Sequence, residues 1–133
     1  MVLITGDTGF IGTNFKKYLK TNQIKFRILK RNEYKLENLK GISSVFHFAG
    51  IAHDTEGVYN YNDYYNANTK LTNDLYNLFL KSDADNFIFM SSIKAQLDYF
   101  NGVLTENIES NPQSFYGRSK YQSEKYIIEN KIY

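Results

Sequence analysis

The chain has 133 residues, of which 42% are hydrophobic and 17% aromatic, with a formal net charge of +2 and no cysteine. This length fits one domain of roughly 100–150 residues, and the mixed charges exclude a charge-driven disordered tail. No window holds the roughly 18 apolar residues of a membrane helix, and the N-terminus lacks a signal-peptide pattern. The missing cysteines exclude disulfide scaffolds, thiolate metal sites and cysteine nucleophiles. We therefore expect a cytoplasmic domain with no membrane role and no metal site.

The apolar pattern alternates between strand and helix along the chain. Four short apolar runs predict buried strands, and three longer segments with apolar residues three and four apart predict amphipathic helices. The segment Lys35–Leu39 fits either a short edge strand or a helical turn. This alternation predicts parallel pairing with right-handed crossovers, and therefore an open α/β sheet with helices on both faces. The expected strands are Val2–Thr5, Lys25–Leu29, Ser44–Ala49 and Asn86–Met90, and the expected helices span 9–20, 61–81 and 114–131.

Positive charge is concentrated in the first third of the chain. Residues 1–40 hold nine basic and three acidic side chains. Such a segment attracts either nucleic acid or a small phosphate ligand. The lysines are scattered, and a glycine-rich loop in the same segment accounts for an anion site more simply. We therefore expect a phosphate ligand and no nucleic acid partner.

The glycine-rich loop is Thr5-Gly6-Asp7-Thr8-Gly9-Phe10-Ile11-Gly12, between the first expected strand and the first expected helix. In a loop of this kind Gly6 permits the tight turn, Gly9 lets a pyrophosphate approach the backbone, and Gly12 lets the helix pack closely. The N–H groups at the helix start then face the anion. An ordinary tight turn without a ligand is the alternative.

The spacing G-x-x-G-x-x-G, with Phe-Ile before the last glycine, resembles the N-terminal signature of extended short-chain dehydrogenases/reductases, the NAD-dependent epimerase/dehydratase family. The resemblance implies a Rossmann-like fold that binds NAD or NADP. Asp7 departs from the family pattern; its charge would weaken phosphate binding if it points at the ligand, and would be harmless if it caps the helix. The cofactor contacts implied in this loop are Gly6, Thr8, Gly9, Phe10, Ile11 and Gly12.

The end of the second expected strand bears on the choice of cofactor. NAD-preferring sites usually have an acidic residue there for the adenosine ribose, whereas cations suit the 2′-phosphate of NADP. This sequence has Lys30 and Arg31 at that point. They favour NADP slightly over NAD.

Tyr116 and Lys120 are four residues apart, so on a helix they share one face. A tyrosine with its ordinary pKa near 10 is a poor base at neutral pH, and a neighbouring ammonium favours the phenolate. The spacing alone is weak evidence, because Tyr121 and Lys125 repeat it. Ser92 adds context: it lies just after the end of an expected strand, where open α/β sheets place their chemistry.

The chain has a strand, then Ser-Ser, then a loop and finally Tyr-Gly-x-Ser-Lys. This order closely resembles the catalytic region of the same family. The resemblance implies that Tyr116 is the catalytic acid/base and that Lys120 lowers its pKa and holds the nicotinamide ribose. Ser92 would hydrogen-bond the reacting sugar oxygen, with Ser91 as the less favoured alternative. The sequence Ala95–Leu97 replaces the usual Val-x-Gly.

Two further stretches carry the resemblance. The strand ending in Phe48, Ala49 and Gly50 is similar to the family's His-Leu-Ala-Ala strand, whose small residues line the cofactor cleft; the histidine before it, His47, is expected to be structural. Asn68 matches the family's helix-kinking asparagine beside the lysine, with Asn66 as the competing candidate. His53 lies either near the substrate phosphates or on the exposed surface.

The resemblance implies a nucleotide-sugar epimerase, dehydratase or reductase, closest to bacterial surface-polysaccharide enzymes with a UDP-linked substrate. In this family the tyrosine helix lies near the middle of the chain. We therefore expect residues 1–133 to be an incomplete NAD(P)-binding Rossmann domain, truncated before the last strands and the substrate domain. A homodimer or a complementing C-terminal half would complete it. The alternative is a truncated, catalytically silent dinucleotide-binding module.

Overall fold

The computed structural model describes residues 1–52 and 57–131. The chain divides into two compact units. The first comprises Met1–Ala49 and Asp74–Met90, and the second comprises Gly50–Asn73 and Ser91–Tyr133. The first unit contains the sheet, and the second is built from helices and a long connection.

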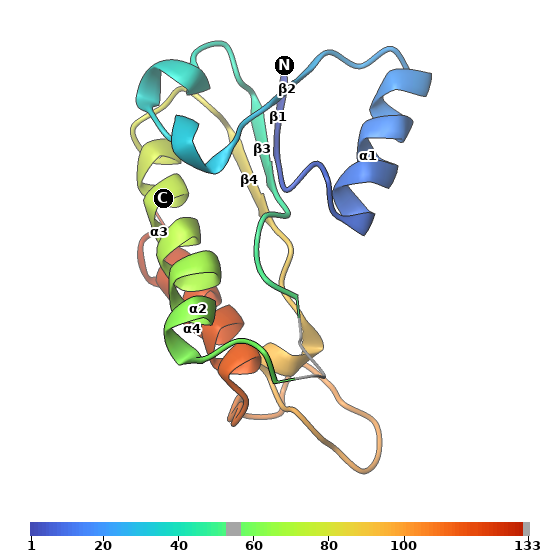
Figure 1. Cartoon of the computed structure of the whole chain (residues 1–133), viewed down its shortest axis with the longest axis vertical. Coiled ribbons are helices and arrows are strands. Elements are labelled where there is room, and N and C mark those ends of the chain that lie inside the picture. Colours follow the sequence, from blue (N-terminus) through green and yellow to red (C-terminus); the bar gives the residue numbers. More distant parts are fainter. Residues whose placement is uncertain (53–56, 132–133) are drawn as a thin grey trace. The chain divides into compact units, whose positions relative to one another are not determined.

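The first unit holds a four-stranded parallel sheet in the order β2-β1-β3-β4. In its register Leu3 lies beside Val45, and Val45 lies beside Phe87. Figure 1 shows the strands running side by side. The order and direction confirm the predicted Rossmann-like sheet. Its strands are β1 (Val2–Thr5), β2 (Phe26–Ile28), β3 (Ser44–His47) and β4 (Asn86–Phe89).

One face of the sheet is packed by α1 (Phe10–Thr21). Phe15 of α1 lies 4.6 Å from Phe46 and 5.4 Å from Phe48, measured between ring centroids. Such aromatic pairs stabilise a fold beyond the area that they bury. They fix the helix that follows the glycine loop against the central strand β3.

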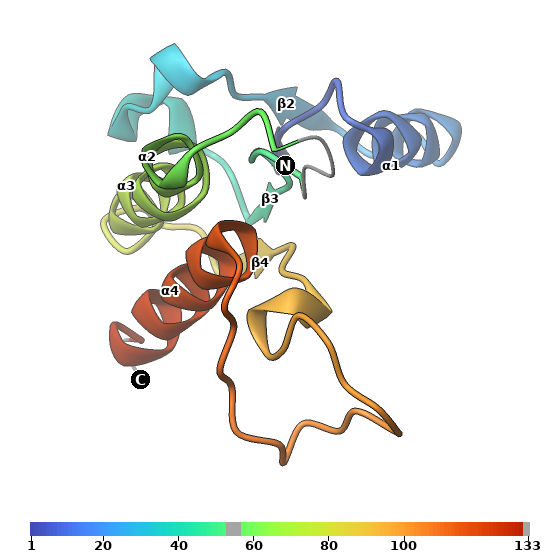
Figure 2. The ribbon, with the colours of Figure 1, turned by 60° about the horizontal axis from the view of Figure 1, so that its bottom comes forward.

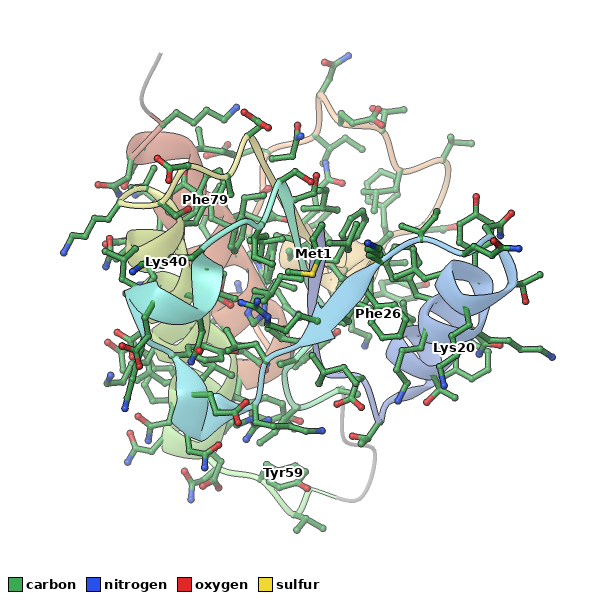
Figure 3. The ribbon with its side chains drawn as sticks, turned by 90° about the horizontal axis from the view of Figure 1, so that it is seen from above. Met1, Lys20, Phe26, Lys40, Tyr59 and Phe79 are labelled. Carbon is green, nitrogen blue, oxygen red and sulfur yellow. The ribbon has the colours of Figure 1, made fainter. Side chains whose placement is uncertain are left out.

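The opposite face is covered by η1 (Arg31–Glu33), η2 (Leu36–Leu39) and the part of α3 (Leu71–Phe79) that belongs to the first unit. Figure 3 shows Lys20, near the end of α1, and Lys40, after η2, on opposite sides of the sheet. Of the two possibilities that the sequence left for Lys35–Leu39, the structure shows the helical turn, as η2. The core under it consists of Leu3, Leu29, Leu39, Ile42, Val45 and Leu75.

The first helical segment of the second unit changes its pitch along its length. It comprises α2 (Tyr61–Tyr64), the π-helix η3 (Tyr65–Lys70) and the start of α3. Asn60 caps it, since its side chain accepts hydrogen bonds from the backbone N–H groups of Asn62 and Asp63. The predicted helix over 61–81 is present, but one turn has π geometry, which inserts an extra residue into the hydrogen-bond ladder.

The remainder of the second unit is η4 (Ile93–Ala95), a long connection and α4 (Phe115–Glu129). Figure 2 shows the connection, in orange, extending away from η4 before it returns to the start of α4. Gln96 links the beginning of this connection to its later part. The side chain of Gln96 donates to the carbonyl oxygens of Thr105 and Ile108, both at 2.7 Å.

Candidate functional site

Gly6 and Gly12 are required by the fold of the loop itself. Gly6 has a φ of 70°, which disfavours residues with a side chain. A Cβ there would also lie 2.5 Å from the backbone nitrogen of Ala49. A Cβ on Gly12 would collide with the carbonyl oxygen of Gly6. Position 12 therefore has no room for a side chain, because the backbone of the loop itself lies against it.

Gly9 is different, because the fold does not need a glycine there. Its φ of −74° suits any residue, and an added Cβ would meet only the carbonyl oxygen of Gly6, at 3.6 Å. Gly9 is the N-cap of α1, and no side chain in the described residues caps the helix. The first N–H groups of a helix have no partner within it. The Gly9 N–H donates to the carbonyl oxygen of Gly6 at 3.2 Å, so the N–H groups that follow it at the start of α1 are the ones that can receive an anion such as a pyrophosphate.

The neighbours of Gly9 are also exposed. Thr8 lies on the surface, Phe10 is 86% exposed and Ile11 is 43% exposed. A phenylalanine with this exposure buries little in the fold, and it is available to cover a ligand. All six loop residues singled out in the sequence thus lie on one short segment at the carboxyl end of β1.

Asp7 takes neither of the positions considered from the sequence. It does not cap α1; its carboxylate accepts hydrogen bonds from Lys16 at 2.8 Å and Lys30 at 2.7 Å. These two bonds hold the pKa of Asp7 below its usual range, against the opposing effect of burial. Lys30 is thus ion-paired, while Arg31 is exposed at the start of η1.

The end of β3 is fixed by buried polar contacts. His47 is fully buried, and its Nδ1 lies 2.6 Å from the hydroxyl of Thr5. The same hydroxyl accepts a hydrogen bond from the backbone N–H of Ala49 at 3.2 Å. Phe48 contacts Phe15 of α1. These contacts hold His47 buried at the end of β3.

In the second unit Asn68 organises a buried hydrogen-bond network. Its Oδ1 accepts from the backbone N–H of Ile51 at 2.7 Å, and its Nδ2 donates to the carbonyl of Ile51 and to the hydroxyl of Ser119. Asn68 is 1% exposed, whereas the competing candidate Asn66 is exposed. A Cβ on Gly50 would lie 2.6 Å from Asn68 Oδ1 and 3.8 Å from Lys120 Nζ. Gly50 therefore lets the chain pass close to both side chains.

Lys120 is the buried cation of α4. It is 7% exposed, and burial lowers its pKa to about 8, with Glu124 acting in the opposite direction. Tyr116 lies one turn before it and packs against Tyr64, with ring centroids 6.0 Å apart. Lys125 of the alternative pair is exposed and ion-pairs with Glu129. Only the first Tyr-x-x-x-Lys pair thus combines a buried lysine with a partly buried tyrosine.

Ser92 lies at the start of η4, and its hydroxyl accepts a hydrogen bond from the backbone N–H of Lys94 at 3.2 Å. That leaves the Ser92 proton to be donated elsewhere. The Ser91 hydroxyl oxygen is buried and has no hydrogen-bond partner among the described residues. Both serines therefore retain the capacity to donate to a ligand oxygen, and the structure leaves Ser91 in place as the alternative.

Asp98 is a contributor that the sequence analysis missed. Its carboxylate accepts from the backbone N–H groups of Gln113 and Ser114, at 2.6 and 2.8 Å, and from the Ser114 hydroxyl. The Ser114 oxygen in turn accepts from the backbone N–H of Gly117 at 3.0 Å. These hydrogen bonds hold the pKa of Asp98 below its usual range, although burial opposes them. Asp98 thus fixes the start of the helix that carries Tyr116.

A pocket of about 360 Å³ opens beside Tyr116 in the second unit. Its size is at the small end of the range for ligand pockets. Aromatic rings dominate its wall, which suits a ligand with an apolar ring face. The residues that line it are Gly57, Tyr59, Tyr64, Gln113, Ser114, Phe115 and Tyr116.

His53, the candidate for a substrate contact, lies outside the described residues. Within residues 1–52 and 57–131, no three His, Asp or Glu side chains come together in a way that could hold a metal ion. In the same residues no helix is both long and apolar enough to cross a membrane.

Comparison with protein-family models gives one match over nearly the whole chain. The model described as the NAD dependent epimerase/dehydratase family matches residues 2–130. No curated protein sequence matches the chain.

Solved structures show the same fold at low identity. MoeE5 in complex with UDP-glucuronic acid and NAD is 24% identical, with a TM-score of 0.85, and the match covers 96% of this chain and 48% of that one. UDP-glucuronic acid 4-epimerase from Bacillus cereus, in complex with NAD, is 20% identical with a TM-score of 0.76, covering 94% of this chain and 50% of that one. DesIV, a dTDP-glucose 4,6-dehydratase from Streptomyces venezuelae with NAD and TYD bound, is 19% identical with a TM-score of 0.83, covering 94% and 49%. The chain thus spans about half the length of the structures that it matches.

Proposed function

We propose that this chain, which belongs to the NAD dependent epimerase/dehydratase family, binds a nicotinamide dinucleotide at its glycine loop. The observation that carries the proposal is Gly9: the fold does not require a glycine there, yet its absent side chain leaves the helix start open. The contacts proposed in the loop are those of Gly6, Thr8, Gly9, Phe10, Ile11 and Gly12. Phe48, Ala49, Gly50 and Asn68 are proposed to line the rest of the cofactor cleft.

The proposed chemistry resides in Tyr116, Lys120 and Ser92. The bound nicotinamide would supply the hydride acceptor. Tyr116 would take the proton of a sugar hydroxyl, and the buried ammonium of Lys120 would stabilise the resulting negative charge and hold the nicotinamide ribose. Ser92 would donate a hydrogen bond to the reacting sugar oxygen. The buried position of Lys120 supports this assignment, since an ammonium shielded from water acts more strongly on a neighbouring oxygen.

The proposed substrate class is a nucleotide sugar, UDP-linked, in a bacterial surface-polysaccharide pathway of the cytoplasm. Epimerase and dehydratase reactions both begin with oxidation of a sugar hydroxyl by the bound dinucleotide. A ketoreductase runs the reverse hydride transfer, from the reduced dinucleotide to a keto sugar, so all three reactions can use the same machinery. Two matched structures hold UDP-glucuronic acid or UDP-glucose beside NAD. His53 and Ser92 are the proposed sugar contacts, and a homodimer or a complementing C-terminal half would supply the remainder of the substrate site.

Replacing Tyr116 tests the catalytic part of the proposal. Tyr116→Phe, in the chain together with the half that completes it, should abolish conversion of a UDP-sugar, followed by chromatographic separation of the sugar nucleotides. Product is measured because an epimerase or dehydratase returns the hydride and accumulates no reduced nicotinamide. Dinucleotide binding should be nearly unchanged, because the ring remains. Tyr121→Phe is the matched control and should retain activity. Equal activity of the Tyr116 variant and the wild type would contradict the mechanism.

A second candidate function is a dinucleotide-binding module without turnover. It remains the alternative because a dinucleotide site does not by itself imply turnover. Calorimetric titration with NAD, NADP and UDP-glucose separates the two candidates. Binding of a dinucleotide without any response to the sugar nucleotide supports the silent module, and binding of both supports the enzyme.

A further inference from the structure

An ion-paired triad joins the glycine loop to the end of β2. Asp7 follows β1 and Lys30 follows β2, and these two strands are neighbours in the sheet. The Asp7 carboxylate bonds Lys30 through one oxygen and Lys16 of α1 through the other. The Asp7 side chain is only 8% exposed, whereas that of Lys30 is 53% exposed. The acid is thus shielded, and the cation that it holds faces solvent.

The triad lies where the two dinucleotides differ. At the end of the second strand, a Rossmann-type site meets the adenosine ribose, and a basic residue there accommodates a 2′-phosphate. A phosphate monoester carries close to two negative charges at neutral pH. To use Lys30, that phosphate must compete with the Asp7 carboxylate and settle close to its charge. NAD has a neutral hydroxyl at the same place and meets no such competition.

We infer that Asp7 is a cofactor-specificity residue that disfavours NADP by holding Lys30, an inference that rests on the proposed dinucleotide function. It reverses the slight preference for NADP that Lys30 and Arg31 indicate in the sequence. The sequence shows two cations at this point, whereas the structure shows that one of them, Lys30, is paired with Asp7, whose carboxylate it shares with Lys16. Asp7 acts through Lys30 and needs no contact of its own with the ligand.

The experiment compares the affinities of NAD and NADP by isothermal titration calorimetry. The proteins are the wild-type chain, Asp7→Asn and a matched control, Asp83→Asn, which removes one exposed carboxylate far along the chain. Because any lost negative charge strengthens the binding of both anionic dinucleotides, the ratio of the two dissociation constants is the informative quantity. Asp7→Asn should shift this ratio about tenfold toward NADP at low salt, and the shift should shrink at high salt. Asp83→Asn should leave the ratio unchanged.

A double variant tests whether the effect passes through Lys30. In Asp7→Asn/Lys30→Gln, the shift toward NADP should disappear, because the released cation is gone. Asp7→Ala serves as a second variant should Asp7→Asn prove unfolded by circular dichroism. An unchanged ratio in a folded Asp7 variant that still binds NAD overturns the inference alone. Failure of the wild-type chain to bind either dinucleotide overturns the proposed function, and this inference with it.

Discussion

Asn68 is the residue whose removal should cost the second unit most. Asn68→Ala deletes three hydrogen bonds: one accepted from the N–H of Ile51, one donated to its carbonyl and one donated to Ser119. A buried polar group that loses its partner costs roughly 1–3 kcal/mol. Ile51 is only partly buried, so water recovers part of the loss, and the Ser119 hydroxyl keeps its bond to the Tyr116 carbonyl. We expect a loss of about 3 kcal/mol in the free energy of unfolding.

Thermal unfolding followed by far-ultraviolet circular dichroism measures the loss. For a chain of this size, about 3 kcal/mol corresponds to a fall in Tm of roughly 10 °C. Asn66→Ala is the control, since it makes the same chemical change in the same π-helical segment at an exposed position. Its unfolding free energy should stay within about 0.5 kcal/mol of the wild type.

Amide hydrogen exchange adds a local readout. The N–H of Ile51 should exchange faster in Asn68→Ala and at the wild-type rate in Asn66→Ala, because Asn68 Oδ1 is its acceptor. Equal losses of stability in the two variants would refute the reasoning. So would unchanged protection of Ile51 in a folded Asn68→Ala protein.

Three further predictions concern single side chains. Burial lowers the pKa of Lys120 to about 8 from 10.5, so the unfolded chain binds more protons between these values, and stability should rise with pH across that window by about 3 kcal/mol. Lys120→Met should remove this rise and Lys125→Met should keep it, as measured by urea unfolding from pH 7 to 11. Asp98→Asn should lower the unfolding free energy by about 1–3 kcal/mol, since the acceptor of the Ser114 N–H and hydroxyl is weakened. Gly12→Ala should unfold the first unit or lower its Tm by more than roughly 10 °C, because its Cβ meets the loop backbone.

A specific result would contradict each of these three predictions. Parallel pH curves for Lys120→Met and the wild type would show that the lysine is not buried as a cation. A Tm of Asp98→Asn equal to that of the wild type would remove Asp98 from the support of α4, and Asp85→Asn serves as its exposed control. A Gly12→Ala protein as stable as the wild type would mean that the loop has room that the structure does not show.

The strands and helices were predictable because their apolar residues repeat with the right period. Leu3 and Val45 are apolar in runs that end at turn residues, and both are fully buried in the sheet. The segment Lys35–Leu39 was ambiguous because five residues are too few to distinguish periods of two and of three. The π geometry of Tyr65–Lys70 was not predictable from periodicity, since one inserted residue barely changes an apolar pattern.

The site was predictable where chemistry depends on local spacing, and not where it depends on distant partners. The glycines and the Tyr116–Lys120 pair stand at fixed short separations. The bond between Asp7 and Lys30 joins residues 23 positions apart, and the hold of Asp98 on Ser114 spans 16. No local sequence pattern predicts either contact. Consequently the charge at Lys30 was interpreted as free in the sequence and is paired in the structure.

Binding of NAD to Gly9→Val tests the central claim, that the glycine loop is a dinucleotide site, most directly. The backbone conformation at Gly9 suits any residue, and an added Cβ would meet one atom at 3.6 Å. The variant should therefore fold, with a Tm lowered by about 5 °C at most, which is the cost of placing valine at a helix N-cap. In calorimetric titration the wild-type chain should bind NAD, and the folded variant should bind at least about tenfold more weakly, because the valine occupies the place of the pyrophosphate. Equal affinity of the two folded proteins for NAD would contradict the claim.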